Sequence, residues 1–178
     1  MDKTITISFT FEKNGEEAIK LYVDLFDRVF GSTNGVSKIL KITYFGAEEL
    51  EGLNDVEAVP KDMLPGPVGS VKTIRFLLKG QEFVAVNGGG YFGKFHESVS
   101  LYISCQNQQQ IDALWETLSL DGEEQPCGWV KDRFGISWQI VPDVLWEIDE
   151  GEDRARAQRV MNAIYHMTRI DIKKVVEA

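Results

Sequence analysis

The segment SVSLYISC, residues 98–105, decides the fold. It alternates apolar residues with serine and tyrosine, and this period of two predicts a half-buried strand. The segment follows FVAVNGGGYFG, residues 83–93, whose glycines have the G-x-G-x-x-G spacing of a dinucleotide-binding turn. Such a turn needs a helix N-terminus directly after the glycines, where the pyrophosphate binds. Because a strand follows instead, we expect a glycine-rich connection between two halves and no nucleotide cofactor.

The same order of elements occurs on both sides of this connection. Each half begins with an alternating strand, continues with an amphipathic helix, and ends with about three strands. In the first half the helix begins after Asn14, a residue that can cap it, and ends at Gly31. The predicted strands cover residues 4–11, 36–45, 71–78 and 81–86 in the first half, and 98–105, 124–131 and 136–141 in the second. The second helix carries Ile111, Leu114, Trp115 and Leu118 on one face.

This repeat predicts an α+β fold of paired βαβββ modules, with an added C-terminal helix. We place the first module at residues 1–90, the second at 91–145 and a helical extension at 146–178, all in one domain. Residues 46–69 form an excursion that is rich in acids, glycine and proline and has no period. Loops of this length are often functional or mobile. The extension carries an apolar stripe at helical spacing, made of Ala157, Val160, Met161, Ile164 and Met167.

The charge of the chain excludes some partners. It has 28 acidic and 19 basic residues, a net charge of -9, and an acidic surface repels phosphate backbones, so we expect no nucleic-acid partner. No apolar run approaches the roughly 20 residues that span a bilayer. The N-terminus lacks the pattern of a signal peptide, and the two cysteines form no recognisable framework. We therefore expect a reduced, cytoplasmic protein without a membrane partner.

Three stretches carry a resemblance to a known family. They are GQEFVAVNGG, the run from SLYISCQNQQQ to SWQIVP, and RVMNAIYHMTRIDIKKVVEA, and the specific part is Cys127–Pro142. The sequence resembles the PhnB-like family of the vicinal-oxygen-chelate superfamily, which includes glyoxalase I, bleomycin-resistance proteins and extradiol dioxygenases. PhnB-like sequences often carry the label 3-demethylubiquinone-9 3-methyltransferase. The resemblance implies two βαβββ modules whose curved sheets enclose a cavity, and it implies a homodimer.

The resemblance also indicates where a metal would bind in related enzymes, on the inner faces of the sheets. The corresponding positions here hold Ser8, Thr10, Ala85, Asn87, Ser100, Tyr102 and Gln139. Neutral amides and hydroxyls are poor ligands for a divalent metal, so we expect no metal and no cofactor. We expect instead a small-molecule ligand. The candidate ligand-binding residues are Ser8, Asn87, Tyr102, Trp129, Trp138 and Gln139.

Two further side chains have alternative interpretations. His96 is either a solvated loop histidine or a proton shuttle at the mouth of the cavity. Cys105 is either a buried inert thiol or a reactive thiolate, and the second role needs a nearby cation or helix N-terminus. The sequence identifies no catalytic residue.

Three hypotheses about function follow, in decreasing order of support. The first is a metal-free small-molecule-binding protein. The second is a metal-dependent enzyme of the glyoxalase or dioxygenase type. The third is the methyltransferase of the family label, which the residues do not support because the one glycine-rich turn does not lead into a helix.

Overall fold

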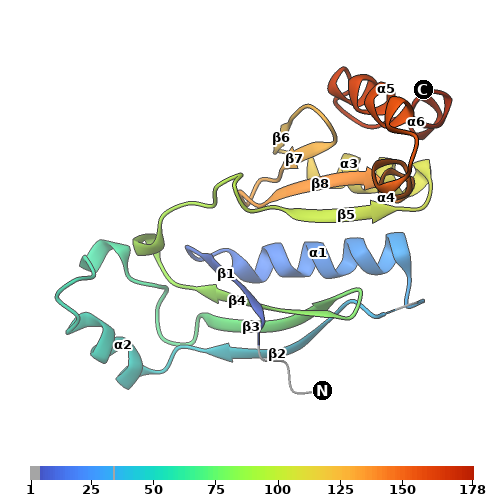
Figure 1. Ribbon diagram of the computed structural model, residues 1–178. Helices are drawn as coiled ribbons and strands as arrows, with labels where there is room; N and C mark the ends of the chain where they lie inside the picture. The colour runs from blue at the N-terminus through green and yellow to red at the C-terminus, as the bar shows by residue number, and fades with distance from the viewer. Residues whose placement is uncertain (1–4, 34) are drawn as a thin grey trace. The chain divides into compact units, whose positions relative to one another are not determined.

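The structure, a computed structural model, describes residues 5–33 and 35–178. Residue 4, where the first predicted strand begins, lies outside the described residues. The chain divides into two compact units, one up to Lys94 and the other Phe95–Ala178. From the sequence we place the end of the first module at residue 90, close to this boundary. Figure 1 shows both units, which are described separately below.

The first unit contains one helix on a four-stranded mixed sheet, with the order β1-β4-β3-β2. Strand β1 pairs in parallel with β4, whereas β2–β3 and β3–β4 are antiparallel. Lys79 and Gly80 both have positive φ in the tight turn that joins β3 and β4, as a type I′ hairpin requires. The elements are β1 (Ile7–Phe11), α1 (Gly15–Phe30), β2 (Lys38–Tyr44), α2 (Ala47–Asn54), the 3-10 turn η1 (Lys61–Met63), β3 (Val71–Leu78), β4 (Gln81–Asn87) and the 3-10 turn η2 (Gly90–Phe92).

Helix α1 covers one face of this sheet, as Figure 1 shows. The alternation predicted from the sequence places apolar side chains on that face, where they meet the apolar stripe of the helix. The buried residues of the sheet face include Phe9, Phe11, Ile74, Phe76, Phe83 and Ala85, and those of the helix include Ala18, Ile19, Tyr22, Leu25 and Phe26. The side chains that alternate with these buried residues lie on the opposite face of the sheet, away from α1.

Asn87, at the end of β4, fixes the start of helix α1. Its Oδ1 atom accepts a hydrogen bond from the Gly15 N–H at 2.9 Å, and its Nδ2 donates to the Val71 carbonyl at 3.0 Å. The side chain of Asn14 makes no capping hydrogen bond, so our expectation that Asn14 could cap the helix is wrong. A Cβ atom on residue 15 would lie only 2.7 Å from Asn87 Oδ1, which explains the glycine there.

The second unit repeats the first in order and pairing, which confirms the predicted α+β fold of two βαβββ modules. Its sheet has the order β5-β8-β7-β6, with β5 parallel to β8 and the other pairs antiparallel. The predicted strand 124–131 is instead two strands, because Cys127 and Gly128 adopt positive φ and break it. The elements are β5 (Leu101–Cys105), α3 (Gln108–Leu118), β6 (Glu123–Glu124), β7 (Trp129–Lys131), β8 (Ser137–Pro142), α4 (Val144–Glu150), α5 (Arg154–Tyr165) and α6 (Ile172–Glu177).

A buried carboxylate organises the turn between β7 and β8. Asp132 is 4% exposed. Its Oδ1 accepts hydrogen bonds from the backbone N–H groups of Phe134 and Ile136, at 2.9 and 3.0 Å, and its Oδ2 accepts from Trp138 Nε1 at 2.7 Å. Because each oxygen accepts at least one hydrogen bond, the cost of burying the carboxylate is offset.

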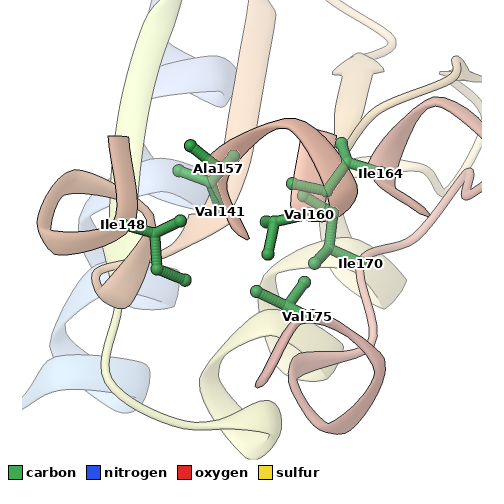
Figure 2. Packing of buried hydrophobic residues seen from close by; sticks show 7 residues of the cluster. All are labelled: Val141, Ile148, Ala157, Val160, Ile164, Ile170 and Val175. Atoms are coloured by element: carbon green, nitrogen blue, oxygen red, sulfur yellow. The ribbon is translucent and has the colours of Figure 1, made fainter. Parts of the chain in front are cut away.

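The C-terminal extension consists of three short helices instead of one, and it packs within the second unit. Figure 2 shows its apolar side chains converging with one another. Ala157, Val160 and Ile164 of the predicted stripe are buried there, whereas Met161 is 37% exposed. The buried members of this cluster are Val141, Ile148, Ala157, Val160, Ile164, Ile170 and Val175. No described helix is both long and apolar enough to cross a membrane.

Polar contacts also hold the extension in place. Gln108, in the first turn of α3, donates from Nε2 to the Ile170 carbonyl at 3.1 Å and accepts from the Ile172 N–H at 2.9 Å. The N–H groups of Cys127 and Gly128 donate to the carbonyls of Met167 and Thr168, both at 2.8 Å. The extension is therefore an integral part of the second unit.

Replacing Asn87 with alanine tests the cap on helix α1. The substitution leaves the Gly15 N–H and the Val71 carbonyl without partners, so we expect a loss of about 1–3 kcal/mol in the free energy of unfolding. Asn14→Ala is the matched control, because the Asn14 side chain makes no cap bond, and it should change stability by less than about 0.5 kcal/mol. Urea denaturation measures both, and equal losses would contradict this account.

Candidate functional site

The first unit contains a partly open, mainly apolar cavity of about 280 Å³. It lies between the sheet face opposite to α1, the excursion over residues 46–69 and the glycine-rich loop. We call the excursion the flap; Figure 1 shows it as the part of the first unit that carries α2. The lining residues are Phe45, Leu53, Val59, Leu64, Pro65, Lys72, Thr73, Val86, Asn87, Gly88, Tyr91 and Phe92.

The floor of the cavity comes from the sheet. Thr73 of β3 and Val86 of β4 are direct cross-strand partners, so their side chains lie on the same face. Their neighbours Ile74 and Ala85 are buried against α1 on the other face. The alternation that builds the core thus also fixes which residues form the floor.

The flap forms one wall of the cavity. Its two ends are joined by backbone hydrogen bonds, from the Phe45 N–H to the Ser70 carbonyl and from the Gly69 N–H to the Phe45 carbonyl, both at 2.9 Å. Helix α2 has no buried residue, and the flap faces the cavity with Leu53, Val59, Leu64 and Pro65. Because its two ends are joined, the flap leaves the sheet and returns to it at the same place.

One ion pair ties α2 to the sheet. Lys72 Nζ lies 2.6 Å from Glu49 Oε1, and the side chains are 32% and 41% exposed. The hydrogen bond from Lys72 is the main cause that holds the pKa of the Glu49 carboxyl below its ordinary value. The positive charge at the cavity wall is therefore neutralised by a carboxylate from the flap.

The glycines of the loop let its backbone pack against the flap. A Cβ atom on Gly89 would lie 2.0 Å from the Met63 carbonyl oxygen and 2.7 Å from the Leu64 carbonyl carbon. The Gly88 and Gly89 N–H groups donate to the carbonyls of Phe11 and Glu12, at 2.8 and 3.0 Å. Only the three-residue 3-10 turn η2 follows them, and the chain then reaches β5. As we expect from the sequence, no α-helix begins at these glycines.

The six predicted ligand-binding residues lie in different places. Asn87 lines the cavity, although its amide is also committed to the α1 cap. Ser8 is exposed on β1. Trp138 is fully buried, and its indole donates to Asp132, so it belongs to the core of the second unit. A ligand-binding role for any of the six stays a prediction.

The other three lie together on the second sheet. Gln139 is the cross-strand partner of both Tyr102 and Trp129, so the three share the sheet face opposite to Trp138. Gln139 Nε2 donates to Ser100 Oγ at 2.8 Å. The Tyr102 ring lies 5.2 Å from that of Trp146. Desolvation and, to a smaller degree, Asp149 raise the pKa of Tyr102.

The two side chains considered as candidates for reactivity, Cys105 and His96, lie in different environments. Cys105 is fully buried, and desolvation raises the pKa of its thiol to about 12, so the inert interpretation holds. His96 Nδ1 accepts a hydrogen bond from the Ser98 N–H at 3.1 Å in an exposed loop. Among the residues that the structure describes, no three His, Cys, Asp or Glu side chains form a group that could hold a metal ion.

Of the residues that line the cavity, only Asn87 is among the ligand-binding residues predicted from the sequence. Leu53, Val59, Leu64 and Pro65 lie in the flap, where the apolar residues follow no period. The available signal was the presence of isolated apolar residues in an otherwise acidic segment, since a solvated loop does not need them.

Comparing two glycine substitutions tests the contact between the loop and the flap. Gly89 and Gly93 both have φ 78°, with ψ -173° and -155°, so alanine is strained at either position by about 1–3 kcal/mol. Only at Gly89 would the new methyl group meet the flap backbone; nothing lies within 4 Å at Gly93. We expect Gly89→Ala to lower the free energy of unfolding by a further ~1–3 kcal/mol. Equal losses in urea denaturation would show that the loop does not pack on the flap.

Comparisons with known proteins agree with this architecture. A family model described as 3-demethylubiquinone-9 3-methyltransferase matches residues 42–141. A solved PhnB protein from Bacillus cereus is 28% identical, with a TM-score of 0.55, and the match covers 79% of this chain and 98% of that one. Protein PA1353 from Pseudomonas aeruginosa, at 16% identity and a TM-score of 0.52 over 79% and 97%, shares the fold. No curated protein matches the sequence. Because the family model covers more than half of the chain, this protein belongs to the 3-demethylubiquinone-9 3-methyltransferase family of PhnB-like proteins.

Proposed function

We propose that this protein is a metal-free small-molecule-binding protein, and that its ligand binds in the cavity of the first unit. The observation that carries the proposal is a mainly apolar, partly open cavity of about 280 Å³ lined by the sheet, the flap and the glycine-rich loop. Ligand sites are typically concave and mainly apolar with a few polar groups, and the smallest have volumes of about 300 Å³. Thr73 and Asn87 supply such polar groups here.

We propose that the predicted residues on the sheet of the second unit form a second surface that contacts a ligand. Tyr102, Trp129 and Gln139 combine aromatic area with an amide that can both donate and accept hydrogen bonds. Ser8, on the edge strand of the first sheet, is the weakest member of the proposed set because it is exposed. Trp138 acts through the core, by supporting the strand that carries Gln139.

We further propose that the protein works as a homodimer. Exposed aromatic side chains support this, including Trp146, which is 50% exposed, and Tyr102, which is 41% exposed. Such side chains are enriched at protein interfaces. Light scattering at micromolar concentration that gave the mass of a single 20.1 kDa chain would overturn this part of the proposal.

The alternatives are a metal-dependent enzyme and the methyltransferase of the family name. A metal enzyme would need charged or imidazole ligands, and the described residues offer no such group of three. A methyl donor with a nucleotide portion favours a glycine turn that opens a helix. Here the corresponding glycines pack against the flap.

Filling the cavity tests the proposed binding site. The probe is 2-naphthylmethanol, an uncharged two-ring alcohol whose fluorescence reports binding. Leu64→Trp adds a bulky ring to a lining position and should weaken binding at least about tenfold. Val68→Trp makes the same change at a flap residue that is 60% exposed and does not line the cavity, so it should leave binding intact. If the unmodified protein does not bind the probe, or if both variants bind it equally well, the cavity is not the ligand site.

Calorimetry tests the metal-free part of the proposal. We expect weak binding of Zn²⁺ and Ni²⁺ to the unmodified protein, because Gln139 brings no charge. Gln139→Glu adds one anionic ligand without a histidine beside it, so its binding should remain weak. Neither form should produce lactoylglutathione. Tight stoichiometric binding that is lost on changing Gln139 or His96 would instead favour the metal-dependent enzyme.

A further inference from the structure

The lining of the cavity indicates the charge of its ligand. Eight of the lining residues are apolar or aromatic: Phe45, Leu53, Val59, Leu64, Pro65, Val86, Tyr91 and Phe92. Thr73 and Asn87 add neutral polar groups, and Gly88 has no side chain. Among the described lining residues, the single charged one is Lys72. Any electrostatic preference of the cavity therefore depends on the state of Lys72.

Lys72 is already paired. Its ammonium lies 2.6 Å from a carboxylate oxygen of Glu49, a residue of α2 that is not part of the lining. An anionic ligand would have to displace Glu49 or lose its hydration without gaining a counter-charge. A cationic ligand would meet Lys72 with no unpaired carboxylate in the lining. Both would pay a desolvation cost that an uncharged molecule avoids.

The floor of the cavity offers hydrogen bonds to a neutral group. The hydroxyl of Thr73 can donate and accept, and Asn87 borders the cavity while its amide pairs with the backbone of Gly15 and Val71. The Thr73 hydroxyl is therefore the side-chain group on the floor to which a neutral polar group of a ligand can bond.

We propose that the cavity selects an uncharged, mainly apolar molecule, about the size of two fused rings, and that the Glu49–Lys72 pair enforces the selection by neutralising the wall. This inference rests on the proposed function and adds the class of ligand to it. Glu49 acts as a positioning residue, since it sets the state of Lys72 and does not itself line the cavity.

The experiment compares three ligands of nearly the same shape at pH 7. They are 2-naphthylmethanol, which is neutral, 2-naphthoate, which is anionic, and 2-naphthylmethylammonium, which is cationic. Isothermal titration of the protein should give a dissociation constant for the alcohol that is at least about tenfold lower than that for either ion.

A matched pair of variants separates the role of the ion pair from a general change in surface charge. Glu49→Gln removes the carboxylate that neutralises Lys72, so 2-naphthoate should bind at least about tenfold more tightly than to the unmodified protein. Glu48→Gln removes the same charge from the neighbouring exposed position and should leave all three affinities unchanged. Circular dichroism checks that both variants are folded.

The outcomes distinguish the inference from the function on which it rests. If the three ligands bind but an ion binds as tightly as the alcohol, the charge selection is wrong while the binding function stands. The same conclusion follows if Glu49→Gln and Glu48→Gln change the affinity for 2-naphthoate equally. If none of the three binds to the unmodified protein, the proposed binding function fails, and the inference fails with it.

Discussion

The organisation of the first unit depends on one buried amide. Asn87 is 5% exposed and joins the end of β4, the first N–H group of α1 and the first residue of β3. Burying an amide is costly unless its atoms are paired, and here the pairing groups are backbone atoms that would themselves be unsatisfied. The same residue borders the cavity. The position of the floor relative to the helix is thus set by an interaction that also completes the fold.

The second unit uses a different side chain for a comparable purpose. Asp132 gathers two backbone N–H groups and one indole N–H in the turn before β8. In both units, therefore, one buried side chain accepts hydrogen bonds from backbone N–H groups of a turn or of the start of a helix. The two halves share topology with little shared sequence, and each pairs otherwise open backbone groups with a residue of its own.

Elements could be predicted best from the sequence where alternating apolar residues are buried on one face of a strand. The predicted strands 71–78 and 81–86 agree with β3 and β4 to within one residue. Alternating apolar residues on both sides of a Lys-Gly turn define a hairpin. The break at Cys127 was missed, since positive φ at a non-glycine residue has no signal in the pattern. The cap by Asn87 was also missed, as it joins residues 72 positions apart. The cavity depends on such long-range contacts, so few of its residues could be predicted.

The flap is held by weaker contacts than the core of the first unit. Helix α2 buries no residue, so little hydrophobic energy holds it, and segments of this kind open at lower free energy than the core. The lowered pKa of Glu49 means that the ion pair contributes its stabilisation above the ordinary carboxyl pKa. That contribution is lost as the pH falls through the lowered value, because the protonated carboxyl no longer pairs with Lys72. At neutral pH the pair is intact, and the contact that ties α2 to the sheet is the one that leaves the cavity wall without net charge.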